Sequence, residues 1–168
     1  MPPSWYFSAS TDAQEIAYAQ EMDRATSLEF SNDGVRDSLT LSMAPEIFHA
    51  NLKREIANAQ REDRDLVVLS IGLVPERFDS VAQAQEALIA LAHQLEHGLR
   101  SGDFYSRIFD WGFWILLRTS ELEAVRIYER FELSDREDVT AHIVARKKDE
   151  YDEWIKKLDL ITFSGNEV

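Results

Sequence analysis

Apolar residues recur along this chain with two spacings, one helical and one extended, and together they predict an α/β protein with a helical lead-in. In the lead-in, the helical spacing predicts one helix that begins at Ser10 or Thr11 and ends near Ser27. A Ser-Asn-Asp-Gly sequence follows and is typical of a break between elements. We therefore expect residues 1–36 to form a separate helical lead-in and residues 37–168 to form one domain.

The domain region alternates between helical and extended patterns. Residues 66–73 form a nearly continuous apolar run of strand length, which is typical of a central strand covered on both faces. Two short apolar segments around an Asp-Trp-Gly sequence predict a hairpin. In chain order we expect a helix at 44–62, a strand at 66–73, a long helix that Ser80 caps, a hairpin of 105–109 and 113–117, a helix that Ser120 caps, a strand at 139–145, a short helix at 149–158 and a final strand at 160–163. This order predicts an α/β sandwich with a central mixed sheet of about five strands flanked by helices.

Composition narrows the classes of function. The chain has 168 residues, of which 31 are acidic and 18 basic, and its net charge of −13 repels nucleic-acid backbones and anionic membranes. It has no cysteine, which excludes disulfides, thiolate metal sites and cysteine nucleophiles. Its longest apolar run is too short to cross a bilayer, and the N-terminal sequence has no secretory pattern. We therefore expect a soluble cytoplasmic protein that binds neither nucleic acid nor membrane.

Several short motifs fall at the spacings of a known family. Residues 37–40 read Asp-Ser-Leu-Thr, and residues 100–103 read Arg-Ser-Gly-Asp. Arg107 lies just before a turn, and the apolar segment 113–117 follows that turn. These motifs resemble the GGDEF domain of diguanylate cyclases, which has D-x-L-T, then R-x-x-D, then R-x ahead of its signature turn. The resemblance covers about residues 37–160 and implies a single GGDEF or nucleotide-cyclase-like α/β domain.

The sequence departs from that family at the positions that carry its chemistry. Aligned in this way, the signature turn reads Phe109, Asp110, Trp111, Gly112 and Phe113. The resemblance implies that the third signature position binds metal and the fourth helps to activate the attacking hydroxyl, and these positions hold Trp111 and Gly112. The family's first metal-binding aspartate falls on Gly72, which has no side chain. Because phosphoryl transfer of this kind needs oxygen ligands for magnesium, we expect no catalytic residue, no metal, no cofactor and no enzyme activity.

Three features leave alternatives open. Asp110 is a carboxylate within the turn, so a residual diguanylate cyclase remains a hypothesis. His93 and His97 belong to an H-x-x-E-H sequence, which binds zinc in inverted zinc peptidases, although a solvated helix face explains them better. Trp111 at the tip of the turn predicts either a side chain that fills the vacated nucleotide pocket or a protein-contact hot spot.

Arg100 and Asp103 are the sharpest ligand-binding candidates, with Arg107 as a second basic group nearby. The resemblance implies that R-x-x-D binds cyclic di-GMP, with the arginine on phosphate and guanine edges and the aspartate on guanine N–H groups. A guanidinium group suits such bidentate recognition. The alternative is structural: Asp103 caps or pairs locally, and Arg100 is a cation favoured at the end of a helix.

These observations lead to two main hypotheses about function. The first is a catalytically inactive, GGDEF-derived signalling module that acts through a protein partner, with or without gating by cyclic di-GMP. The second is a dedicated cyclic di-GMP receptor that binds through Arg100 and Asp103. The lead-in helix also resembles the segment through which such domains dimerise, which predicts a homodimer.

Overall fold

The computed structural model describes residue 28 and residues 30–164, so the predicted lead-in helix lies outside the described residues. The described elements are α2 (Pro45–Glu62), β1 (Val67–Leu73), a short 3-10 helix (Pro75–Arg77), α3 (Val81–Gly98), β2 (Phe104–Phe109), β3 (Gly112–Leu117), α4 (Glu121–Arg130), β4 (Val139–Ala145) and α5 (Tyr151–Ser164). Each helix in this part of the chain falls short of the length and apolar character that a membrane span requires.

Four strands form one sheet in the order β2-β3-β1-β4, and every neighbouring pair is antiparallel. The predicted α/β fold class is confirmed, but among the described residues the sheet has four strands where about five were predicted, and it is antiparallel where a mixed sheet was predicted. The predicted final strand at 160–163 belongs to α5 instead. A helix forms there because Trp154 and Leu158, one turn apart, are both fully buried. One turn later, Thr162 accepts a hydrogen bond of 3.0 Å from the indole N–H of Trp114.

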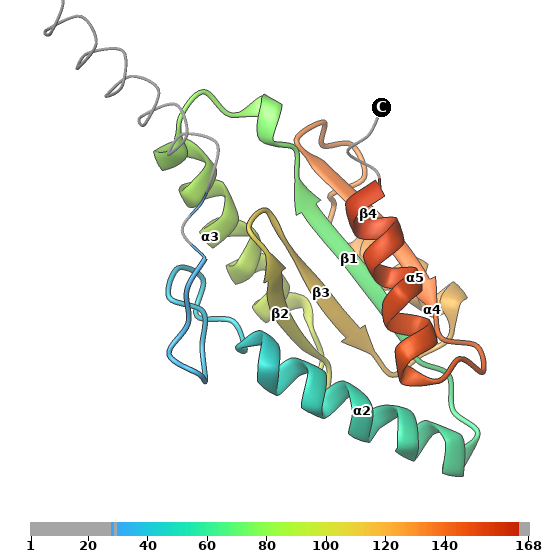
Figure 1. The fold of residues 1–168 in the computed structure, drawn as a ribbon. Coiled ribbons are helices and arrows are strands. Elements are labelled where there is room, and N and C mark those ends of the chain that lie inside the picture. The colour runs from blue at the N-terminus through green and yellow to red at the C-terminus, as the bar shows by residue number, and fades with distance from the viewer. Residues whose placement is uncertain (1–27, 29, 165–168) are drawn as a thin grey trace, which may run out of the picture.

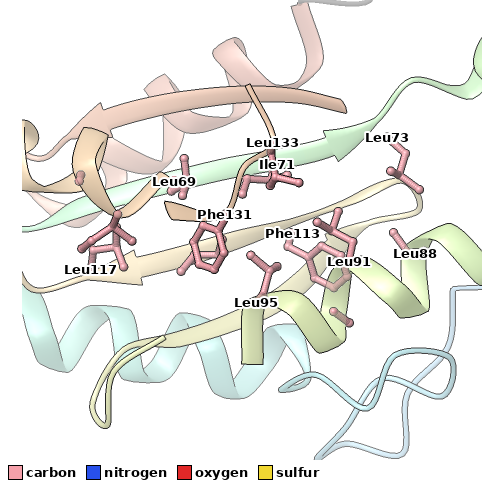
Figure 2. Close-up of a cluster of buried hydrophobic side chains, with 14 of the residues drawn as sticks. Leu69, Ile71, Leu73, Leu88, Leu91, Leu95, Phe113, Leu117, Phe131 and Leu133 are labelled. Atoms are coloured by element: carbon pink, nitrogen blue, oxygen red, sulfur yellow. The ribbon is translucent and has the colours of Figure 1, made fainter. Parts of the chain in front are cut away.

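Helices cover both faces of the sheet (Figure 1). α3 and α4 pack against alternate residues of β1 that include Leu69 and Ile71, while α2 and α5 pack against residues on the other face that include Val68. Figure 2 shows the first cluster, in which Leu95 of α3 and Phe113 of β3 lie close together under the sheet. Since β1 has a strand on each side and helices on each face, it is buried along its whole length, as its apolar sequence predicts.

The local signals at the helix starts are confirmed. Ser80 Oγ accepts a hydrogen bond from the backbone N–H of Gln83 at the start of α3, and Ser120 Oγ accepts one from Glu123 at the start of α4. Pro45 lies in the first turn of α2, where its missing N–H has no cost. Each of these side-chain caps joins residues three positions apart and contributes about 1 kcal/mol.

Candidate functional site

Two glycines, Gly72 of β1 and Gly112 of β3, face each other in the sheet. A Cβ atom on Gly112 would lie 2.3 Å from the carbonyl oxygen of Ile71 and 2.5 Å from the Phe109 ring, so no side chain fits there without movement of the backbone. A Cβ atom on Gly72 would lie 3.2 Å from the same Phe109 ring. The ring therefore lies against both glycines: Gly72, where the resemblance implies a metal-binding aspartate, and Gly112, where it implies the residue that helps to activate the attacking hydroxyl.

A bulge in the hairpin and a contact with α5 hold the Phe109 ring in this place. The register of β2 against β3 shifts at Ile108, so that Phe109 pairs with Gly112. Such bulges change the direction of the side chains that follow them. The ring of Phe163 in α5 meets the Phe109 ring edge to face, with 5.7 Å between the ring centroids. An aromatic contact between two distant elements thus closes this end of the sheet.

The space that remains beside Gly72 is a cavity of about 80 Å³. Its walls include the polar side chains of Ser70, Thr140 and Thr162 as well as the ring of Phe109. Pockets that hold drug-sized ligands measure about 300–1,000 Å³. A cavity of this size accommodates water molecules but not a nucleotide.

Trp111 lies at the tip of the hairpin and is half-buried. Its ring stacks on the ring of Phe78 with 6.3 Å between centroids, and it also lines the small cavity beside Gly72. Its carbonyl oxygen accepts a hydrogen bond of 2.8 Å from the backbone N–H of Leu73. These contacts favour the interpretation that Trp111 fills space within the domain over the interpretation that it is a contact hot spot.

The described residues offer little for a metal ion to bind. Asp110 is in the hairpin turn, and its carbonyl oxygen accepts hydrogen bonds of 3.1 and 2.8 Å from Nε and Nη2 of Arg107. His97 Nδ1 lies 2.7 Å from the carbonyl oxygen of His93, a contact within one turn of α3. In the described part of the chain, no three His, Asp or Glu side chains are grouped in a way that could hold a metal.

Arg107 takes part in an internal ion pair. Its side chain is 0% exposed, and its Nη1 lies 3.2 Å from Oδ1 of Asp37, which is 1% exposed. Asp37 Oδ2 also accepts hydrogen bonds from the backbone N–H and the hydroxyl of Thr40, at 2.8 and 2.7 Å. The prediction that Arg107 is a ligand-binding group is thus not supported in this structure, because its guanidinium group has no access to a ligand in solution. Its role is to connect the segment of residues 37–40 to the hairpin.

Arg100 and Asp103 lie together in the loop between α3 and β2. Asp103 Oδ2 accepts a hydrogen bond of 3.2 Å from the backbone N–H of Arg100, and Gly102 between them has a φ of +110°. The Arg100 side chain is 62% exposed, and its Nη2 lies 3.5 Å from Oε1 of Glu123 in α4. Exposed ion pairs of this kind contribute about 0–1 kcal/mol, so an anionic ligand could displace Glu123 at small cost. Ligand binding at Arg100 and Asp103 stays a prediction.

A second basic group near this loop is Arg118, which the sequence analysis did not identify. A Cβ atom on Gly102 would lie 3.4 Å from Arg118 Nη1, so the guanidinium group is next to the loop. Arg118 Nη2 also lies 2.6 Å from Oε1 of Glu55, which is almost fully buried in α2. No motif marks Arg118, because its proximity to Gly102 depends on the pairing of β2 with β3.

Comparison with known proteins places this arrangement in a recognised fold. No protein-family model matches the sequence, and no curated protein matches it. Among solved structures, the GGDEF domain of TpbB (YfiN) from Pseudomonas aeruginosa is 23% identical, with a TM-score of 0.64, over 77% of this chain and 87% of that chain. The GGDEF domain of DgcB from Caulobacter crescentus, in complex with cyclic di-GMP, is 14% identical, with a TM-score of 0.66, over 82% of this chain and 92% of that chain.

A third solved structure contains a partner protein. The diguanylate cyclase SiaD from Pseudomonas aeruginosa, in complex with its activator SiaC, is 20% identical, with a TM-score of 0.63, over 95% of this chain and 65% of that chain. At these identities, the similarity establishes the fold. The chain has a GGDEF-like fold, as the spacing of its motifs predicts.

Proposed function

We propose that this GGDEF-like domain is a catalytically inactive signalling module that acts through contact with another protein. The observation that carries the proposal is the packing of the Phe109 ring over Gly72 and Gly112. At these two positions the family resemblance implies oxygen-bearing side chains, and here neither position has a side chain; at Gly112 the backbone also leaves no room for one.

The chemistry of cyclase activity explains why this packing matters. Transfer of a nucleotidyl group requires magnesium ions, which bind carboxylates and phosphate oxygens in near-octahedral geometry. The Phe109 ring packs over Gly72, one of the two positions that the resemblance assigns to the metal, and the adjoining cavity of about 80 Å³ is too small for a nucleotide. The carboxylate of Asp110 alone would have to replace two metal-binding carboxylates. The backbone carbonyl oxygen of Asp110 already accepts hydrogen bonds from Arg107.

A role in protein contact is supported by exposed apolar side chains on two helices. Leu122 and Val125 of α4 are exposed, and so is Leu160 of α5. The structure of SiaD with its activator SiaC is an example in which a protein with this fold binds a partner protein.

A homodimer formed through the lead-in is the form of contact that the sequence predicts. Light scattering at micromolar concentration would then give twice the 19.4 kDa of the chain.

Incubation with GTP and magnesium, followed by chromatography, tests the absence of activity. We expect no cyclic di-GMP to form. The matched control is Asp110→Ala, which removes the carboxylate of the turn. Product from the unmodified protein that disappears in Asp110→Ala would show a residual cyclase that depends on Asp110 and would overturn the proposal. Product that persists in the variant and scales with the purified protein would overturn it as well.

A second candidate function is reception of cyclic di-GMP at Arg100 and Asp103. The exposed guanidinium group of Arg100, the nearby Arg118 and the R-x-x-D spacing support it. The DgcB domain, which shares the fold, has been solved in complex with cyclic di-GMP.

Titration calorimetry with cyclic di-GMP separates the two candidates. A receptor would release or absorb heat in a saturable way, and Arg100→Ala would abolish the signal. Arg77→Ala is the matched control, because Arg77 is also exposed and paired with a glutamate, but lies elsewhere on the surface. Absence of heat with the unmodified protein would end the receptor hypothesis and leave the protein-contact hypothesis in place.

A further inference from the structure

An open depression of about 480 Å³ lies at the end of the sheet opposite to Gly72. The loop that follows α2 and the loop that follows β4 form it, and these loops lie side by side because the start of β1 pairs with the end of β4 (Figure 1). The backbone N–H of Arg146 donates a hydrogen bond of 2.9 Å to the carbonyl oxygen of Leu66, which connects the two loops directly. The depression is therefore built on a firmly paired part of the sheet.

The lining of this depression reverses the charge of the rest of the protein. Four basic side chains line it, and they are Arg64, Arg146, Lys147 and Lys148. Two carboxylates, those of Asp63 and Asp65, also line it. In a chain with a net charge of −13, this local excess of positive charge is unusual. Arg64 is paired with Glu62 at 2.6 Å, whereas the other three basic residues form no salt bridge with any described carboxylate.

Arg146 is a buried cation that forms no salt bridge with a described carboxylate. Its exposed fraction is 5%, its Nη1 donates a hydrogen bond of 3.0 Å to the carbonyl oxygen of Asp149, and its Nε is buried with no hydrogen-bond acceptor. Burial of an unpaired charge is costly, and proteins normally compensate for it with an ion pair or a bound ion. A bound anion would provide the missing counter-charge.

We infer that this depression binds the phosphate group of a small phosphate monoester. Arg146, Lys147 and Lys148 supply the charge and the N–H donors that a phosphate dianion requires. The volume exceeds that of a phosphate ion and lies in the range of small-molecule pockets, which leaves room for a ligand that extends beyond its phosphate. Asp63 and Asp65 can accept hydrogen bonds from hydroxyl groups of that extension. A nucleic acid is a poor candidate, because the strongly negative net charge repels a long polyanion.

The test is a titration of the full chain with inorganic phosphate at pH 7.5, with sodium chloride added to keep the ionic strength constant. We expect a saturable rise in Tm, since a ligand that binds the folded state stabilises it. The double variant Lys147→Gln/Lys148→Gln, which alters only exposed side chains, is expected to weaken phosphate binding by about tenfold or more. Arg146→Gln is expected to abolish it. Lys156→Gln, an exposed lysine of α5 outside the depression, is the control and should bind as the unmodified protein does.

Two results would overturn the inference. One is a Tm that rises equally with sodium chloride alone, which would show a general effect of ions. The other is undiminished phosphate binding in the double lysine variant, which would place the site elsewhere. If Arg146→Gln does not fold, the double lysine variant alone decides the question. The outcome is independent of cyclase activity and of cyclic di-GMP binding, since neither involves these residues.

Discussion

Arg107 and Asp37 form a fully buried ion pair although 70 positions separate them in the sequence. The pair joins the segment that precedes α2 to the hairpin that carries Phe109. The ring of Phe30 also lies 5.2 Å from the Arg107 guanidinium carbon, so the same arginine contacts the residues that come just before the domain. Residues on both sides of Asp37 thus contact the hairpin, since Ser42 Oγ accepts a hydrogen bond from the backbone N–H of Arg107 as well.

Loss of one partner of this pair should destabilise the domain strongly. Removal of a single member of a buried pair leaves an uncompensated charge and costs about 3–5 kcal/mol. We expect this loss for Arg107→Met and for Asp37→Leu, measured as the free energy of unfolding in urea. The double variant should cost clearly less than the two single variants together. Single variants that each cost less than about 1 kcal/mol would contradict a structural role for the pair.

Substitution of the two facing glycines should have unequal effects. Gly112→Ala places a methyl group against backbone atoms that cannot move aside, and we expect it to cost about 3 kcal/mol of folding stability. Gly72→Ala meets only the Phe109 ring, and we expect a cost of about 1 kcal/mol. Urea unfolding followed by circular dichroism measures both. Equal effects would show that the Phe109 ring is held as rigidly as the backbone.

Arg100→Ala should leave stability almost unchanged. Its ion pair with Glu123 is exposed, and surface substitutions of this kind change the free energy of unfolding by about 0.5 kcal/mol or less. Any loss of cyclic di-GMP binding in this variant would then reflect the site itself. A large loss of stability would mean instead that Arg100 holds the loop between α3 and β2, and binding data on the variant would need a different control.

Folding stability should fall at mildly acidic pH because of His49. Burial lowers the pKa of His49, which has the Tyr151 hydroxyl 2.8 Å from its Nδ1 and the Trp114 ring beside it. Since the folded state disfavours the charged imidazole, this contribution to stability is fully present above the pKa of the unfolded chain, about 6.5, and is lost as the pH falls through the lower pKa of the folded state. Urea unfolding between pH 7.5 and pH 5 measures it.

The control for this prediction is His49→Gln, which removes the titrating group and keeps a hydrogen-bonding side chain beside Tyr151. We expect the dependence of stability on pH to be shallower in the variant over that range. An identical dependence in both proteins would assign the effect to other groups.

Several features of the site were accessible from the sequence because they depend on residue identity alone. The absence of carboxylates at Gly72 and in the third and fourth positions of the signature turn follows from the alignment of short motifs. Arg100 and Asp103 lie close together because only three positions separate them in one loop. The burial of Arg107, its pairing with Asp37 and the proximity of Arg118 could not be predicted, since each depends on how β2, β3 and the leading segment come together.

The same division applies to the fold. Helix starts at Ser80 and Ser120, the buried strand β1 and the hairpin could be read from the chain, because each results from interactions among residues within a few positions of one another. The directions of the strands could not be read in this way. Nor could the helical state of residues 160–163, because an apolar segment of that length suits a strand or a helix equally until it packs against its neighbours. Packing of α5 against Trp114 and Phe109 selected the helix, and the same packing placed the ring of Phe163 against the ring of Phe109 beside Gly72.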